Sequence, residues 1–188
     1  MEIINKLEPK KGRFLLAEPF ANDPYFKRSV ILITEYTEAG AVGFLLNKPL
    51  SITLGDTIKD FKESDMEIYS GGPVGTVTLY FVHTLGKQLE GSIEIQKGLF
   101  WGGRFESLKK LYEAGQINDN EIKFFIGYAG WGKGQLEKEV TDKAWIVADS
   151  ESKFILNYLP ENMWKDILTS LGKNYEILSN FPEDPQLN

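Results

Sequence analysis

The sequence predicts an α+β fold with a mostly antiparallel or mixed sheet. Runs rich in β-branched and aromatic residues occur in pairs that short glycine-containing turns connect, as is typical of hairpins. Helical periodicity is concentrated in the last third of the chain and does not alternate with each strand. Strand clusters with appended helices favour α+β over a repeated βαβ pattern. A chain of 188 residues, 42% of them hydrophobic, is long enough to build one core.

The N-terminal third predicts the start of the sheet. Three apolar, β-branched stretches are expected to be strands: residues 13–17, 29–35 and 41–46. We expect the third strand to end at Asn47-Lys48-Pro49, because proline lacks the N–H that continues a ladder. Thr53 is placed to cap a short helix that extends through Asp60.

The middle of the chain predicts short strands and one amphipathic helix. The expected strands are residues 67–70, 76–83, 92–96 and 99–101. Residues 104–114 place Phe105, Leu108 and Leu111 on one helical face, and Gly115 follows as a stop.

The last third predicts two strands and three helices. The expected strands are residues 121–128 and 144–148, and the expected helices are residues 135–142, 154–159 and 161–171. A glycine-rich turn is expected over Gly130–Gly134, and an extended tail from Phe181. We expect a single domain over residues 1–188, with residues 1–11 and 179–188 peripheral or extended.

Composition excludes several kinds of chemistry. A net charge of −6 opposes direct binding to nucleic acid or to an anionic membrane. The absence of cysteine excludes disulfides, iron–sulfur clusters and thiol nucleophiles, and the single histidine, His83, cannot form a site that needs two imidazoles. No apolar run approaches the roughly 20 residues that cross a bilayer, and the N-terminus lacks a signal-peptide pattern. We therefore expect a cytoplasmic protein with no membrane contact, no metal and no cofactor.

His83 is the one histidine that can serve as a general base. It closes an apolar strand, and Ser29 or Ser70 is a candidate nucleophile if the fold brings one of them to His83; a water molecule is the alternative nucleophile. Arg28 or Lys48 would then orient a phosphate or acyl substrate. The alternative is a strand-terminal histidine that is hydrogen-bonded to the backbone.

A phosphate-loop pattern is incomplete. Residues 127–133 fit G-x-x-x-x-G-K, but the next residue is Gly134, which has no hydroxyl to hold magnesium. We interpret this stretch as a turn that joins a strand to a helix.

Polar and aromatic residues near strand ends predict a ligand pocket. Asn47 and Lys48 converge where an apolar strand stops, and we expect them at the rim. Tyr128 and Trp131 would form an aromatic wall, and Gly71–Gly75 a loop of close approach. A protein interface formed by the tryptophans is the other interpretation of these aromatic residues.

Five motifs occur in a fixed order along the chain. They are Phe26-Lys27-Arg28-Ser29-Val30, Gly43-Phe44-Leu45-Leu46-Asn47-Lys48-Pro49, Gly71-Gly72-Pro73-Val74, Gly127-Tyr128-Ala129-Gly130-Trp131 and Gly134-Gln135-Leu136-Glu137. This order resembles the bacterial AlgH/YqgE family over nearly the whole chain. The resemblance implies one α+β domain with a mixed sheet bent into a partial barrel and flanked by helices. It supplies no catalytic residues, because the function of the family is uncharacterised and some members are labelled transcriptional regulators only from genetic context.

The family-like positions define our candidate site. The residues expected to bind a ligand are Arg28, Asn47, Lys48, Gly72, Pro73, Tyr128, Trp131 and Gln135. We expect a regulatory or ligand-binding domain that acts through a small molecule or a protein partner, without direct contact to nucleic acid. The alternative is a hydrolase that uses His83 on a phosphate or acyl compound. Many family members carry a Glu-His pair where this chain has Glu35-Tyr36, so chemistry that needs that histidine has no counterpart here.

Overall fold

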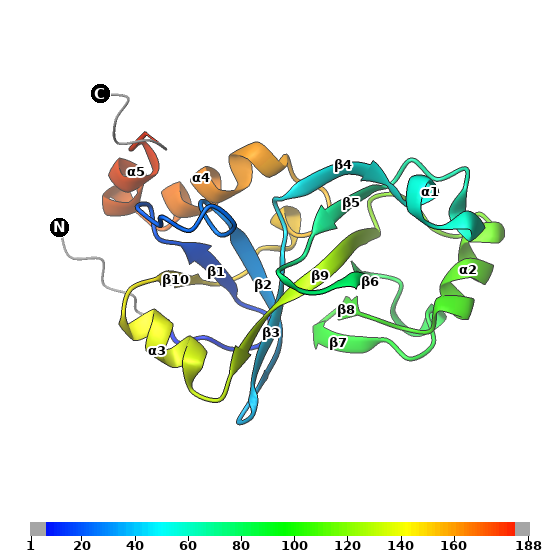
Figure 1. Ribbon diagram of the computed structural model, residues 1–188, viewed down its shortest axis with the longest axis horizontal. Helices are drawn as coiled ribbons and strands as arrows, with labels where there is room; N and C mark the ends of the chain where they lie inside the picture. Colours follow the sequence, from blue (N-terminus) through cyan, green and yellow to red (C-terminus); the bar gives the residue numbers. More distant parts are fainter. Residues whose placement is uncertain (1–6, 183–188) are drawn as a thin grey trace.

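The computed structural model describes residues 7–182, and within them ten strands form one open sheet (Figure 1). The strands are β1 (Phe14–Ala17), β2 (Val30–Thr37), β3 (Gly40–Leu45), β4 (Pro49–Thr53), β5 (Glu67–Ser70), β6 (Val74–His83), β7 (Ile93–Gln96), β8 (Leu99–Trp101), β9 (Ile122–Gly132) and β10 (Trp145–Ala148). The α-helices are α1 (Leu54–Thr57), α2 (Phe105–Glu113), α3 (Gln135–Thr141), α4 (Pro160–Ser170) and α5 (Lys173–Ser179). The α+β single-domain prediction is confirmed.

Strand β9 joins the two halves of the sheet. The strand order is β10-β1-β2-β3-β9-β6-β8-β7, with β5 also paired to β9 and β4 paired to β5. The C-terminal end of β9 pairs with β3, whereas its N-terminal part pairs with β5 and β6. The β5–β9 pair is parallel and the other strand pairs are antiparallel, which gives the mixed sheet that the sequence predicts.

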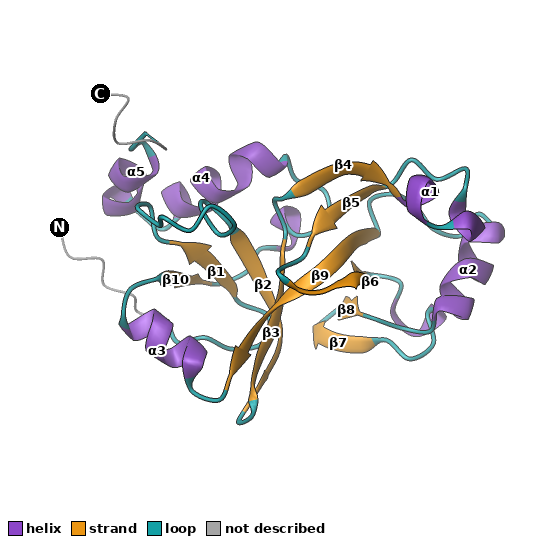
Figure 2. Cartoon of the chain, in the orientation of Figure 1, coloured by secondary structure: helices purple, strands orange, loops and turns teal. Residues whose placement is uncertain are grey.

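The helices cover the sheet at separate places (Figure 2). Helices α4 and α5 lie along the β1–β2 end on one side, α3 lies on the other side of that end, and α1 and α2 lie beyond β4–β6. Within residues 7–182, no helix combines the length and the apolar character needed to span a bilayer.

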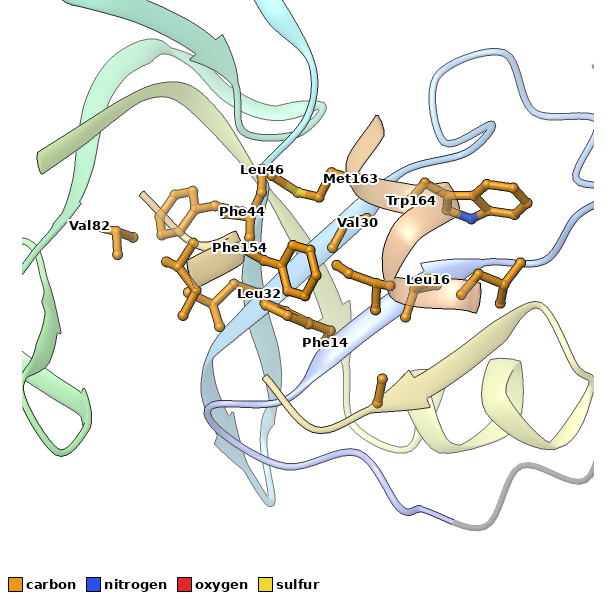
Figure 3. Packing of buried hydrophobic residues seen from close by; sticks show 14 of the residues in the cluster. Phe14, Leu16, Val30, Leu32, Phe44, Leu46, Val82, Phe154, Met163 and Trp164 are labelled. Carbon is orange, nitrogen blue, oxygen red and sulfur yellow. The ribbon is translucent and has the colours of Figure 1, made fainter. Parts of the chain in front are cut away.

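Strand β1 and the first half of β2, residues 30–33, are continuously apolar because both of their faces are buried. Successive side chains of a strand point to opposite faces. Phe14 and Val30 therefore pack toward α4, with Met163 and Trp164 above them (Figure 3), whereas Leu15 packs in the cluster that includes Leu136 of α3. Burial on both faces explains a continuous apolar run in place of an alternating one.

The chain between β3 and β5 differs from the prediction. Strand β3 ends at Leu45, but Pro49 is the first residue of β4, a position where its missing N–H costs no ladder bond. Thr53 caps α1 as predicted, in a capping box with Asp56, although the helix ends at Thr57.

The turn predicted over Gly130–Gly134 is confirmed only at residues 133–134, because β9 continues through Gly132 and pairs with β3. A close approach makes this pairing feasible. A Cβ added at Gly40 would lie 2.1 Å from the carbonyl oxygen of Trp131. The same pairing removes the loop on which the phosphate-binding alternative depends.

The C-terminal third is only partly as predicted. Helix α4 is confirmed, but residues 154–159 form no α-helix, since Leu159 precedes proline and adopts an extended conformation. Helix α5 was not predicted, and its last residue, Ser179, is buried in a segment that we expected to be peripheral. The expected tail and N-terminal segment lie in part outside the described residues, at 183–188 and 1–6.

Candidate ligand-binding site

A cavity of about 320 Å³ lies where the loop before β2, the β3–β4 connection and the start of α4 meet. Its lining residues are Pro24, Lys27, Arg28, Asn47, Lys48, Pro160, Glu161, Trp164 and Lys165. The structure therefore brings together three of the predicted ligand-binding residues, Arg28, Asn47 and Lys48. We refer to this cavity as the basic pocket.

The basic pocket concentrates positive charge in an acidic protein. Among residues 7–182, four cationic side chains and one carboxylate line it, a formal charge of +3, in a chain whose net charge is −6. The cations come from three separate segments: Lys27 and Arg28 precede β2, Lys48 follows β3, and Lys165 belongs to α4. The first turn of α4 also lies at the wall, and the N-terminus of a helix favours anions.

Asn47 lines the pocket, and its side chain is hydrogen-bonded to the backbone of Arg28 and Val30. Its Oδ1 accepts a hydrogen bond from the N–H of Val30 at 2.9 Å, and its Nδ2 donates to the carbonyl of Arg28 at 2.9 Å. Both ends of the amide are therefore engaged by the segment that carries Arg28.

Lys48 is fixed against the opposing loop. Its Nζ donates to the carbonyl of Lys27 at 2.7 Å, and its own carbonyl accepts from the N–H of Ser70 on β5 at 2.7 Å. The Tyr25 hydroxyl lies 2.5 Å from Ser70 Oγ and fastens the same loop to β5. These bonds hold the loop and the β3–β4 connection together as one wall.

Arg28 combines an unusual backbone conformation with side-chain contacts to Trp164 and Phe181. Its φ of 52° lies in the left-handed region, which costs a non-glycine residue about 1 kcal/mol or more. Its guanidinium carbon lies 5.0 Å from the ring centroid of Trp164, and Nη2 donates to the carbonyl of Phe181 at 2.5 Å. The hydrogen bond from Asn47 stabilises the strained backbone of this pocket-lining residue.

Trp164 forms the floor under Arg28. The indole is 2% exposed, and its Nε1 donates to the carbonyl of Ala17 at 2.9 Å. One ring face thus supports a cation, and the polar edge anchors α4 to β1.

Three other predicted residues lie away from the basic pocket. Gly72 crosses the backbone of Tyr128 so closely that an added Cβ would lie 2.0 Å from the Tyr128 carbonyl carbon. Pro73 follows it, and Tyr128 itself pairs with Val74. None of these residues lines the basic pocket, and the Gly72–Tyr128 contact is a close backbone crossing between two segments of the sheet.

Trp131 and Gln135 belong to a separate cluster around Glu139. The indole nitrogens of Trp131 and Trp145 donate to Glu139 Oε2 at 2.9 and 2.8 Å, and Gln135 Nε2 donates to Oε1 at 2.9 Å. These contacts tie α3 to β9 and β10. The aromatic wall that we expected beside Asn47 and Lys48 is formed by Trp164.

His83 and Ser29 are not brought together. Two strands, β3 and β9, lie between β2 and β6 in the sheet, and both side chains are fully buried. Nδ1 of His83 accepts from the N–H of Leu85 at 3.2 Å, so Nε2 carries the proton and donates to the carbonyl of Gly102 at 2.9 Å. Burial lowers the pKa of His83 below its ordinary value, and the ring is a neutral, backbone-bonded histidine at the end of β6.

Sequence reasoning missed the contribution of α4 to the pocket. Glu161, Trp164 and Lys165 follow one another within about one and a half turns, but nothing in that pattern points to residues near 28 and 48. Lys27, next to Arg28 in the first motif, carried the one available signal. Among residues 7–182 there is no cluster of three or more carboxylate or histidine side chains that could hold a metal ion.

Comparison with known proteins places this geometry in a family. The AlgH-like family model matches residues 14–176. The chain belongs to the AlgH-like family. The UPF0301 protein BF2109 of Bacteroides fragilis is 40% identical over 185 residues, which cover 98% of this chain and 94% of that protein. A UPF0301 protein of Cytophaga hutchinsonii is 41% identical over 181 residues, with 95% and 98% covered.

Two solved structures of similar proteins share the fold. The solution structure of AlgH from Pseudomonas aeruginosa is 28% identical, with a TM-score of 0.74 and coverage of 95% of this chain and 98% of that one. The crystal structure of protein DIP2367 from Corynebacterium diphtheriae has a TM-score of 0.78 at 22% identity and covers 95% of each chain. The resemblance noted from the five sequence motifs is confirmed.

Proposed function

We propose that this AlgH-like protein binds a small anionic molecule in the basic pocket and acts in the cytoplasm without direct contact to nucleic acid. The observation that carries the proposal is the convergence of Lys27, Arg28, Lys48 and Lys165 on one cavity of about 320 Å³. Ligand pockets usually measure about 300–1,000 Å³, so a small molecule fits and a nucleic-acid duplex does not. The net charge of −6 of the chain also disfavours the phosphate backbone of DNA.

Two observations support ligand binding over a purely structural role for these cations. Arg28 holds a strained backbone, and strained residues cluster at functional sites. Lys48 and Arg28 are both positioned by backbone carbonyls, so their charges are in place before a ligand arrives.

Thermal unfolding against a panel of anions tests the proposal. A ligand present at 100 times its Kd adds about 2.7 kcal/mol of stability and so raises Tm by several degrees. We expect phosphorylated or polycarboxylate compounds to raise Tm, and neutral analogues to leave it unchanged. The double variant K48M/K165M should lose the shift, and K110M, which removes an exposed lysine of α2, should keep it. A flat panel, or a shift that the double variant retains, would overturn the proposal.

A further inference from the structure

We infer that a second copy of this chain docks on the free edge of β6, where the two β6 strands pair antiparallel about a two-fold axis. The edge consists of residues 74–80, and it lies outside the residues that line the basic pocket. Three properties of this segment carry the inference: it is unpaired, it is exposed, and it carries no charge.

The N-terminal part of β6 lacks partner strands. The register of β6 on β9 shifts between Val74 and Leu79, so that residues 75–78 have no partner on β9. On its other edge, β6 pairs with β8 only through its last two residues, 82 and 83. Gly75, with a φ of 62°, allows the backbone to bend away from β9. Among residues 7–182, no strand therefore pairs with residues 75–78 on either edge.

The unpaired residues are also exposed on both faces of the strand. Successive side chains of a strand point to opposite faces, and yet residues 74–78 are all exposed. Val74 is 41% exposed and Val77 is 98% exposed. The segment therefore projects from the sheet, where the backbone of another strand can approach it.

This segment lacks the features that protect strand edges from pairing. Residues 68–86 contain no Asp, Glu, Lys or Arg, although these types make up 26% of the chain. Two other edges of the sheet are protected. Strand β4 begins with Pro49 and has a register shift, with Ser51 at a φ of 56°, and on β7 the exposed Glu94 has its carbonyl bonded to Lys11. An exposed, uncharged edge rich in β-branched residues is where strand addition is expected.

The residues of this edge suit pairing with a second copy. In an antiparallel pair about a two-fold axis, each strand meets its own sequence, so a charge on the axis would face the same charge. We place the axis at Val77, the centre of residues 74–80. Val77 then faces Val77 of the second copy, and Thr76 faces Thr78, a type of cross-strand pair that is favourable. Because this edge is uncharged, two chains of net charge −6 can meet here without like charges in contact.

Light scattering after gel filtration, from micromolar to submillimolar chain concentrations, tests the inference. One strand pair is smaller than the roughly 1,200–2,000 Å² of stable interfaces, so we expect a dimer that dissociates on dilution. V77K should raise its Kd by about fivefold or more, because two lysines then face each other, whereas V77T should retain the dimer. A mixture of V77K and V77E should dimerise under conditions where neither variant does alone. Since Val77 is 98% exposed, none of these variants removes a buried contact.

Cross-linking tests the position of the axis. The chain has no cysteine, so V77C introduces a single thiol. Opposed residues of antiparallel strands have Cα atoms about 4.5–5.5 Å apart, within the range of a disulfide. Oxidation with diamide should convert V77C to a covalent dimer. E94C, which places the thiol at an exposed position on the edge strand β7, is the matched control and should cross-link much more slowly.

Two results would overturn the inference. The first is a chain that stays monomeric at every concentration, with V77C cross-linked no faster than E94C; the β6 edge would then be left to an extended segment of another protein. The second is a dimer that V77K leaves intact, because the contact would then lie elsewhere on the surface. Neither result bears on anion binding by the basic pocket.

Discussion

The side chain of Asn47 closes the backbone turn at Arg28, donating to the Arg28 carbonyl at 2.9 Å while it accepts from the N–H of Val30, also at 2.9 Å. A residue that the sequence suggests for ligand recognition thus positions the backbone of Arg28, another residue of the proposed binding site. If the proposed function is right, Asn47 acts on binding through the strained backbone of Arg28.

Replacing Asn47 by alanine is expected to lower the free energy of unfolding by about 1–3 kcal/mol, because it leaves a partly buried N–H and a carbonyl without their partner. Urea unfolding measures the loss, and N120A, at an exposed position, is the control. We also expect N47A to weaken anion binding, since the backbone of Arg28 relaxes. A variant as stable as the parent would show that the amide is dispensable.

Lys123 is a buried cation outside the basic pocket. It is 4% exposed, its Nζ lies 3.9 Å from the ring centroid of Tyr69, and burial lowers its pKa from 10.5 to about 7. The unfolded chain keeps this proton up to about pH 10, so between about pH 7 and 10 it binds more protons than the folded chain and stability rises with pH. Below about pH 7 both states are protonated, and the full cost of burying the charge is present.

Replacing Lys123 by methionine is therefore expected to stabilise the protein, by roughly 2 kcal/mol or more near pH 6 and by less near pH 9. Denaturant unfolding at the two pH values measures the difference, with K110M as an exposed-lysine control. A gain that is equal at both pH values would point to packing alone.

Glu139 binds the indole N–H groups of Trp131 and Trp145 through one oxygen, at 2.9 and 2.8 Å. We expect E139A to cost roughly 2–4 kcal/mol, because both buried donors lose a charged acceptor. E139Q keeps an oxygen acceptor and should cost less. Unfolding followed by tryptophan fluorescence measures both, and E63A, at an exposed position, should change little. A similar loss in E139Q and E139A would indicate that the negative charge itself is required.

Gly72 has a φ of +154°, and a Cβ there would overlap the backbone of Tyr128 and Ala129 at 2.0–2.2 Å. Because neither backbone can move without breaking the sheet, G72A is expected to lower stability by at least about 3 kcal/mol. G132A is the matched control, since its nearest neighbouring atom is 3.9 Å away. Thermal unfolding of the two variants should show a large fall in Tm for G72A only.

Local patterns predicted most strands because β-branched runs and glycine turns act over a few residues. Helix α5 escaped prediction because Gly172 ends α4 and begins the next helix at once, so it was interpreted only as a stop. The extension of β9 through Gly132 was also not predicted. Its glycines are typical of a turn, and the strand that pairs with them, β3, lies some 90 residues earlier in the sequence. These are tertiary effects that override local propensity.

The candidate site was likewise predictable from the sequence only in part, because tertiary packing brings some of its residues together. Arg28, Asn47 and Lys48 were predicted together because each follows or precedes an apolar strand, and neighbouring strands bring their ends together. Trp131 and Gln135 share the same family-like pattern, but their hydrogen-bond partners show that they fasten α3 to the sheet. Trp164 and Lys165 lie more than 110 residues from Asn47 in sequence, and only the packing of α4 places them beside it.

The central position of β9 has a consequence for synthesis on the ribosome. Strands β3, β5 and β6 each need β9 as a pairing partner, and β9 begins only at Ile122. A nascent chain that has not yet emerged to this point holds apolar strands with unsatisfied edges, which is the state that chaperones protect. The β1–β2–β3 segment also lacks a strand until β10 has been synthesised, because one edge of β1 pairs with residues 145–148. The protein is therefore committed to its native state only after most of the polypeptide has been made.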